Sequence, residues 1–454
     1  MPSGAGAQIA SGLPGAKAWR RIARAIITRK ALADAGWDHD DPGMRVERPD
    51  FTFEQNKNIL GFMSQADMKS IELFAGAGGL GIGLHRAGFR PVKVVERDAY
   101  CCDTIRENQG RAGSVVNDWR LEQGDVRAVD FREYEGAVDL VSGGPPCQPF
   151  SMGGKHKTYD DARDMFPQAI RAVREAKPKV FVFENVKGLT RASFQNYFEY
   201  IQMQMRHPEV VARPDEDWMD HLARLEQHHT SKPTGGLNYR LVTRLLNAAN
   251  HGVPQKRERV LFVGFRDDLD LEWSFPINTH SAEALIWDQY RDGSYWDRHR
   301  VALKDRPKKE MLTARAARMD ARPVGEAWKT VRDAIHDLPD PEGDAAKAGK
   351  VSNHRQQSGA RSYPGHTGSP LDEPAKTLKA GVHGVPGGEN MLRKPTGEVR
   401  YFTVRESARL QTFPDDYVFH GSWSETMRQL GNAVPVRLAE MVGKDVAHRL
   451  RFAA

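Results

Sequence analysis

Residues 69–81 read KSIELFAGAGGLG, an apolar run that passes directly into a glycine-rich turn. The run 69–73 predicts a buried strand, and the glycines after it predict a tight turn that opens a helix. Because glycine has no side chain, the turn lets a ligand approach the backbone N–H groups at the helix start. We therefore expect this segment to begin an α/β fold and to bind a polar or anionic group.

The same unit of strand, loop and helix recurs downstream as far as residue 265. Alternating units of this kind are the signature of a parallel, doubly wound sheet with helices on both faces. The ranges that predict strands are 69–73, 91–96, 138–142, 180–184, 239–247 and 259–264, and those that predict helices are 80–87, 99–108 and 163–176.

The remainder of the chain differs from this core in composition. Residues 1–65 begin with a Gly/Ala-rich stretch and continue as a basic amphipathic helix, which packing on the main domain explains more readily than a binding arm does. Residues 266–400 are rich in Asp, Arg, Pro and Gly without regular alternation, and they predict a separate, irregular domain. Helical periodicity returns over 429–450.

Bulk properties narrow the class of protein. The 454 residues are 39% apolar with a net charge of +6 and a pI near 9.1, which fits a soluble protein and permits a polyanionic partner. Only Cys101, Cys102 and Cys147 occur, so neither a disulfide framework nor a metal site is predicted. Because no apolar run suits a membrane span and no secretory signal is visible, we expect an intracellular protein.

Acidic residues at two strand ends favour a cofactor that contains adenosine. Glu96 follows Gly76 by about 20 residues, the spacing at which a carboxylate accepts hydrogen bonds from ribose hydroxyls. Asp125 is placed to accept a hydrogen bond from an adenine amino group. The glycines alone leave the cofactor open, because Gly76-x-Gly78-x-x-Gly81 also matches a nicotinamide dinucleotide fingerprint or a purely structural turn.

Cys147 lies in the segment 143–151, GGPPCQPFS, directly after a predicted strand. The carboxyl edge of a doubly wound sheet is where ligands bind. A lone cysteine is often a buried apolar residue, but such cysteines lie in helices or strands rather than between the prolines of a loop. We therefore interpret Cys147 as a nucleophile.

Glu184, Arg257 and Arg259 are further candidates for the same site. Glu184 ends an apolar strand, where burial would raise its pKa and favour the proton-donating form; a capping or surface acid is the alternative. Arg257 and Arg259 alternate on a predicted strand and so point to one face, where they would hold a carbonyl or a phosphate. By itself this run would be a solvated basic edge.

The chain resembles the DNA (cytosine-5)-methyltransferase family, of the bacterial restriction-modification type, in six segments that follow the family's order. The resemblance covers most of the chain from residue 69 to the C-terminus, and six motifs in fixed order are far more specific than any one of them. The segments are 74–78, 145–148, 184–186, 255–259, 405–414 and 429–435.

The resemblance implies a Rossmann-like methyltransferase sheet formed by residues 69–265 and 430–454, and a smaller, irregular target-recognition domain at 266–425. A cytosine flipped out of double-stranded DNA would be methylated at carbon 5 through a covalent Cys147 adduct at carbon 6. Glu184, Arg257 and Arg259 would surround the ring. S-Adenosyl-L-methionine would be bound by Phe74, Ala75, Gly76, Gly78, Glu96, Asp125, Val126, Pro145, Asn432 and Val434. The sequence departs from the family at Arg97, where an aromatic residue often stacks on the adenine.

The implied partner is double-stranded DNA, read by the segment around Lys379 and His383, although an ordinary surface loop explains these two residues about as well. The family type also raises a cognate restriction endonuclease as a partner. We expect a cytoplasmic monomer that meets the nucleoid through DNA. An NAD-dependent dehydrogenase is one alternative, but it would leave the segments 145–148 and 255–259 without a role. A tRNA cytosine methyltransferase is a second, against which the long variable stretch 266–400 favours a reader of duplex DNA. An inactive DNA-binding homologue is the third, and the presence of every chemical residue disfavours it.

We predict that Cys147→Ser reduces methyl transfer to no more than a trace of the wild-type rate, because the thiolate is needed for attack on the ring. Cofactor affinity should stay near wild type, since Cys147 lies outside the glycine turn. Transfer of a tritiated methyl group to DNA and equilibrium dialysis of the cofactor measure the two effects. Substantial methylation by this variant would exclude Cys147 from the chemistry.

Overall fold

The computed structural model describes residues 68–146, 164–231, 235–364, 367–380 and 388–452. Three sequence predictions lie outside the described residues, namely the nucleophile Cys147, the recognition residue His383 and the N-terminal extension 1–65. Among the helices of the described part, none is both long and apolar enough to cross a membrane.

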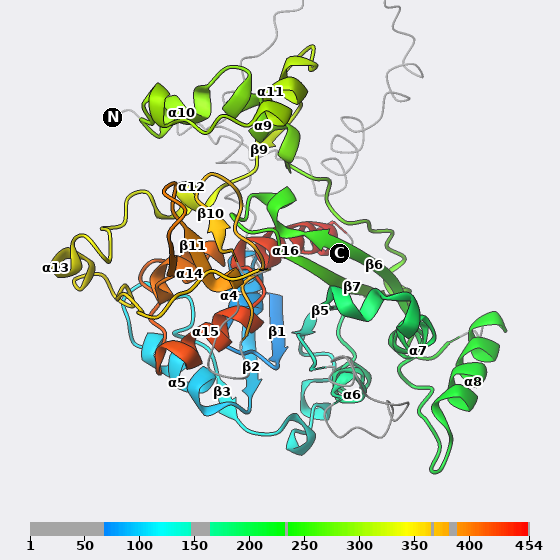
Figure 1. The fold of residues 1–454 in the computed structure, drawn as a ribbon. Coiled ribbons are helices and arrows are strands. Elements are labelled where there is room, and N and C mark those ends of the chain that lie inside the picture. Colours follow the sequence, from blue (N-terminus) through cyan, green and yellow to red (C-terminus); the bar gives the residue numbers. More distant parts are fainter. Residues whose placement is uncertain (1–67, 147–163, 232–234, 365–366, 381–387, 453–454) are drawn as a thin grey trace, which may run out of the picture. The chain divides into compact units, whose positions relative to one another are not determined.

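Seven strands form one sheet (Figure 1), with bounds β1 (Met68–Leu73), β2 (Phe89–Glu96), β3 (Leu121–Gln123), β4 (Leu140–Gly143), β5 (Val180–Val186), β6 (Tyr239–Asn247) and β7 (Glu258–Arg266). Their order is β3-β2-β1-β4-β5-β7-β6. Strands β1 to β5 run parallel, and β7 runs antiparallel to both of its neighbours. The predicted α/β fold is confirmed, with β7 as the one reversed strand of this sheet.

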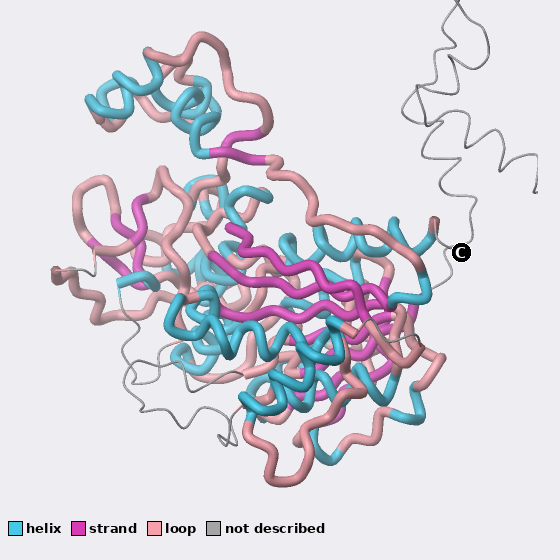
Figure 2. Tube along the Cα trace, turned by 90° about the vertical axis from the view of Figure 1, so that its right-hand side faces the viewer, coloured by secondary structure: helices cyan, strands magenta, loops and turns pink. Residues whose placement is uncertain are grey.

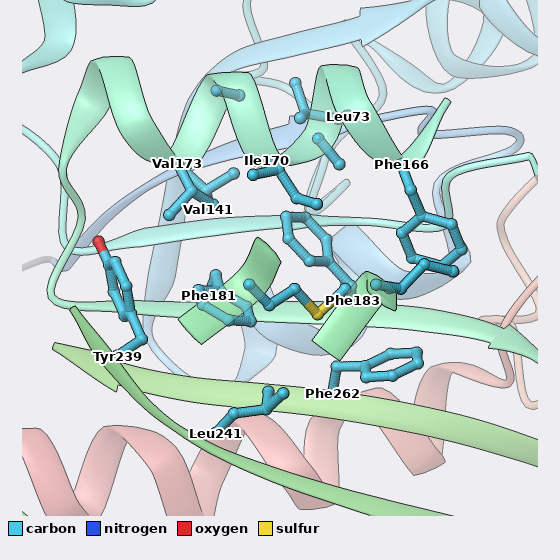
Figure 3. Close-up of a cluster of buried hydrophobic side chains, with 14 of the residues drawn as sticks. Leu73, Val141, Phe166, Ile170, Val173, Phe181, Phe183, Tyr239, Leu241 and Phe262 are labelled. Atoms are coloured by element: carbon cyan, nitrogen blue, oxygen red, sulfur yellow. The ribbon is translucent and has the colours of Figure 1, made fainter. Parts of the chain in front are cut away.

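Helices cover both faces of the sheet (Figure 2). Side chains alternate along β5, so that Phe181 and Phe183 face one layer while Val180 and Val182 face the other. Figure 3 shows Phe181 and Phe183 below Ile170 and Val173 of helix α6. The main helices are α4 (Gly79–Arg86), α5 (Ala99–Asn108), α6 (Phe166–Ala176), α7 (Gln195–Arg206), α8 (Trp218–Thr230), α14 (Val404–Leu410), α15 (Trp423–Asn432) and α16 (Val436–Arg451).

Glycines let helix α4 approach α16 closely. A Cβ atom added at Gly83 would lie 2.4 Å from the Ala439 Cβ and 2.5 Å from the Val436 carbonyl oxygen. A Cβ at Gly79 would lie 2.4 Å from the Val434 carbonyl oxygen. Part of the glycine pattern therefore serves packing between the two ends of the fold, and not ligand approach alone.

Residues 266–400 contain more regular structure than their composition predicts. Their elements are β8 (His280–Ser281), α9 (Ala282–Tyr290), α10 (Ser294–Arg298), α11 (Glu310–Ala317), β9 (Glu326–Ala327), α12 (Val331–Ile335), α13 (Ala345–Ala348), β10 (Ser369–Pro370), β11 (Met391–Arg393) and β12 (Val399–Tyr401). Each is short, and they form two small sheets, β10-β11-β12 and β8-β9. The division into a catalytic part and a recognition part stays a prediction.

We predict that Gly83→Ala lowers the free energy of unfolding by about 1–3 kcal/mol, because the new methyl group overlaps α16. In an open helix the same change would instead be stabilising. Urea denaturation measures the effect. Gly124→Ala is the control, because the nearest atom to a Cβ at Gly124 is 3.7 Å away and belongs to the flexible Glu122 side chain. Equal stability of the two variants would contradict the packing argument.

Candidate functional site

The Glu96 carboxylate accepts hydrogen bonds from two backbone N–H groups, one of which belongs to the glycine turn. The Gly76 N–H donates to Glu96 Oε2 at 2.8 Å, and the Asp98 N–H donates to Glu96 Oε1 at 2.7 Å. Phe74, Gly76 and Gly78 all have positive φ, and a Cβ at Gly76 would meet no atom within 4 Å. The turn therefore borders open space while its carboxylate is held in place, an arrangement that fits the hydroxyls of a bound nucleoside.

Asp125 lies at the same sheet edge as Glu96. Gln123 on β3 pairs with Glu96 on β2, and the Gly124 N–H donates to the Glu96 carbonyl at 2.9 Å. The Asp125 carboxylate accepts from the Arg127 N–H at 3.0 Å and lies 3.8 Å from the Arg97 guanidinium. The structure thus brings together the two acids that the sequence singled out, and Arg97 lies beside them.

Val126 and Pro145 border this edge through their backbones. Val126 is buried, and its carbonyl accepts from Arg171 Nη2 at 2.8 Å. The Pro145 carbonyl accepts from Asn185 Nδ2 at 2.9 Å, and the next carbonyl, of Pro146, accepts from the Met165 N–H at 3.0 Å. The residues on either side of the undescribed segment 147–163 are therefore fixed to β5 and to the start of α6.

Glu184 and Arg259 form a buried pair at the end of β5. Arg259 Nε lies 2.5 Å from Glu184 Oε1, although the two atoms are not aligned as a hydrogen bond. Burial raises the pKa of the Glu184 carboxyl, and this effect exceeds the opposing attraction of Arg259 and Arg257. A Cβ at Gly144 would lie 3.2 Å from Glu184 Oε2, so this glycine leaves room for the carboxyl beside the loop that leads to Cys147.

Arg257 is surrounded by backbone carbonyls of two distant segments, which the sequence did not predict. It precedes β7, and its fully buried guanidinium donates to the Leu378 carbonyl at 3.0 Å and to the Gly431 carbonyl at 2.6 Å. Alternation along a strand correctly placed it near Arg259, but it could not show which backbone carbonyls would surround the side chain. In the structure Arg257 joins two distant segments through its Nη atoms, and its guanidinium still interacts electrostatically with Glu184, so its predicted role at the substrate stays a prediction.

The C-terminal segment returns to the glycine turn. The Val434 carbonyl lies against Gly79, and Asn432 is exposed at the end of α15. The Tyr417 hydroxyl donates to the Ala77 carbonyl at 2.9 Å. Gln411 donates to the carbonyls of Leu430 and, at 3.2 Å, Ala433. Gln411 and Asn432 lie in segments that resemble family motifs. The contacts of Gln411 and the role of Tyr417 were not predicted from the sequence.

Lys379 lies on a loop that packs against the end of α15. Its N–H and carbonyl bond to the Asn390 side chain at 3.0 and 2.9 Å, and its ammonium lies 2.8 Å from Glu389. A Cβ at Gly431 would lie 2.3 Å from the Ala380 nitrogen. The loop is therefore fixed next to the site, while the role of the Lys379 side chain in reading DNA stays a prediction.

Glu72 is a site neighbour that the sequence interpretation missed. It is 1% exposed in the middle of β1, and it accepts a hydrogen bond from the Ser142 hydroxyl. Burial raises the pKa of its carboxyl to about 8. Because Ile71 and Leu73 face the opposite layer, an acid at the intervening position must point to the α4 side. The alternation of side chains along β1 is therefore the feature of the sequence that could have identified Glu72.

Comparison with known proteins identifies relatives along most of the chain. The family described as C-5 cytosine-specific DNA methylase matches residues 68–208 and 228–448. Type II methyltransferase M.Eco47II of Escherichia coli is 33% identical over 389 residues, which cover 84% of this chain and 79% of that protein. Type II methyltransferase M.NgoMIV of Neisseria gonorrhoeae is 31% identical over 84% of this chain and 98% of its own.

Among solved structures, a prophage-encoded Escherichia coli protein assigned as a DNA modification methyltransferase superposes with a TM-score of 0.52 at 21% identity. The match covers 85% of this chain and 99% of that one. At this identity the likeness supports the fold.

We predict that Glu72→Gln removes a pH dependence of stability. The folded chain keeps the Glu72 proton up to about pH 8, whereas the unfolded chain loses it near the ordinary value of 4.5. The unfolded state therefore binds fewer protons in this window, and wild-type stability falls as pH rises, by up to roughly 1.4 kcal/mol per pH unit. The variant should gain on wild type between about pH 5 and about pH 8 in urea denaturation.

The matched control for this change is Glu310→Gln, at an exposed acid. Its stability should follow wild type at each pH. A difference between Glu72→Gln and wild type that does not change with pH would show that the buried carboxyl is ionised in the folded chain.

Proposed function

Because this chain belongs to the C-5 cytosine-specific DNA methylase family, we propose that it transfers a methyl group from S-adenosyl-L-methionine to carbon 5 of a flipped-out cytosine. The substrate would be a specific sequence in double-stranded DNA. The observation that carries the proposal is the meeting of the glycine turn, the Glu184–Arg259 pair and the anchored end of the Cys147 loop at one sheet edge. Relatives named Type II methyltransferases support a restriction-modification role with a cognate endonuclease.

The described residues fit such a cofactor. Glu96 presents a carboxylate beside open space at Gly76, and Asp125 lies at the next strand end. When bound there, S-adenosyl-L-methionine supplies an electrophilic methyl group. Phe74, Ala75, Gly78, Val126, Pro145, Asn432 and Val434 would complete the pocket.

The chain's own side chains would carry the ring chemistry. The Cys147 thiolate would add to carbon 6 of the cytosine, forming a carbon–sulfur bond and shifting electron density to carbon 5. Glu184, whose pKa is raised by burial, would donate a hydrogen bond to ring nitrogen 3 as negative charge develops. Once carbon 5 carries its methyl group, its proton leaves and the carbon–sulfur bond breaks, which restores the thiolate.

Recognition of DNA would be the task of a separate domain of the chain. Residues 69–265 and 430–454 would form the catalytic domain and residues 266–425 the recognition domain, in which Lys379 and His383 would contribute to site choice. Bases can be distinguished only through their groove edges, so this contribution needs side chains outside the catalytic groups. Binding to DNA would hold a monomeric cytoplasmic enzyme at the nucleoid.

We predict that a duplex carrying 5-fluorocytosine at the target becomes covalently attached to the enzyme, because fluorine cannot leave carbon 5 as a proton does. Bisulfite sequencing of plasmid DNA from an expressing host identifies the target. A shifted band in denaturing electrophoresis detects the adduct. An ordinary cytosine duplex and Cys147→Ser are the controls. If the enzyme methylates the plasmid but forms no adduct, the covalent route is wrong.

A further inference from the structure

A small helical unit in residues 280–328 carries a basic surface that the site does not use. Strands β8 and β9 close the unit, and α9, α10 and α11 pack around Leu285, Tyr295 and Trp296. Between residues 298 and 318 the sequence has eight lysines and arginines but two acids, Asp305 and Glu310. We call the exposed basic side chains of this stretch the basic face.

Half of these eight cations are neutralised by nearby acids. Their partners lie within 2.9 Å, in the pairs Arg298–Asp333, Arg306–Asp297, Lys309–Glu373 and Arg315–Glu283. The other four are exposed, and their side chains have no ion pair or hydrogen bond to any described residue: Arg300, Lys304, Lys308 and Arg318. Asp305 and Glu310 in the same stretch are exposed and have no ion pair to a described residue, so the four unpaired cations leave a local excess of positive charge, which favours an external anion.

Two of these unpaired cations line a shallow hollow. Lys304 and Lys308 line a hollow of about 1250 Å³ together with three further basic residues, and its acidic lining residues are Asp292 and Glu310, so positive charge is in excess there. Arg291 is held over the Trp287 ring, 5.7 Å from its centroid. Like charges arranged along an open surface repel one another, and a polyanion with regularly spaced charges relieves this repulsion.

The unit is fixed to the segment that precedes Arg257 and Arg259. Trp328 Nε1 donates to Asn250 Oδ1 at 3.0 Å. Glu373 accepts Lys309 at 2.8 Å and also lies 3.5 Å from Lys256, the neighbour of Arg257 in sequence. Because these contacts tie the unit to the base of β7, the basic face has a defined position relative to the Glu184–Arg259 pair.

We propose that the basic face binds the phosphate backbone of duplex DNA beside the target base, an inference that rests on the proposed function. Lysines on an exposed loop contact phosphates as point charges and carry no base information. The face would therefore add affinity equally to every DNA sequence. Site choice would remain with other residues.

The test compares wild type with Lys304→Gln/Lys308→Gln. Binding to a random duplex of about 30 base pairs is measured by fluorescence anisotropy between about 50 and about 200 mM salt. The double variant should bind roughly ten-fold more weakly near 150 mM salt, and its slope of log affinity against log salt should fall by about 1.8. Lys304→Glu/Lys308→Glu should bind more weakly still. Thermal melting checks that each variant is folded.

The matched control is Lys179→Gln/Lys444→Gln, which removes the same charge from exposed lysines elsewhere, each paired with an acid. Its salt slope should equal that of wild type. Plasmid methylation by every preparation is followed in parallel. If wild type methylates DNA while the Lys304/Lys308 variant keeps the wild-type slope, the inference is overturned and the proposed function stands. If wild type methylates no DNA, the proposed function fails first.

Discussion

The guanidinium of Arg257 joins three segments that are far apart in the sequence. It lies at the base of β7, and its hydrogen bonds reach the backbone at Leu378 and Gly431. Gln255, two residues earlier and also fully buried, accepts from the Leu378 N–H and donates to Gln411. A buried charged group is costly unless its hydrogen bonds are satisfied, so these carbonyls and the guanidinium depend on one another. This contact therefore fixes both the loop at Leu378 and the C-terminal segment at Gly431 that returns to the glycine turn.

The same region concentrates buried charge. Arg257, Arg259 and Glu184 lie close enough for each to affect the pKa of the others, and burial opposes ionisation of all three. A carboxyl in such surroundings keeps a proton more readily than one in water, yet two guanidinium groups stand ready to stabilise its anion. A small change nearby, such as entry of an aromatic ring, therefore shifts the proton balance of Glu184.

Much of the sheet could be predicted because strands such as β4, β5 and β7 are largely buried, mostly apolar runs, although the edge strand β6 carries exposed Arg240 and Arg244. The range of β6 was predicted to the residue, and β5 within two residues of its end. Strand β3 was missed, since Leu121 is its one apolar residue and no period emerges from three positions. The longer helices α7 and α8 were not predicted either. Helices α12 and α14 were missed as well, although both begin with a capping box, at Thr330–Asp333 and Thr403–Glu406. Short elements have too few residues to display a period, and their end signals are easily overlooked.

The positions of some site residues could be predicted because they lie at the ends of neighbouring parallel strands. Glu96 and Asp125 follow strands that must end at one edge, so their proximity follows from topology. The surroundings of Arg257 could not be derived, because they depend on backbone atoms more than a hundred residues away in sequence. Glu72 differs from these residues. The acid can be read from the sequence, but its burial depends on the packing of α4 against β1, which the sequence does not show.

The packing of α16 on α4 has a consequence for synthesis on the ribosome. Helix α4, the first described helix, packs against α16, and the contacts of Tyr417 with Ala77 and of Val434 with Gly79 form only after those late residues have been made. Contacts across so long a span form late, because chain closure must precede them. A nascent chain that already carries β1 to β7 would still expose the apolar side of α4. Such a chain would lack the contacts of Tyr417 and Val434 that complete the glycine turn.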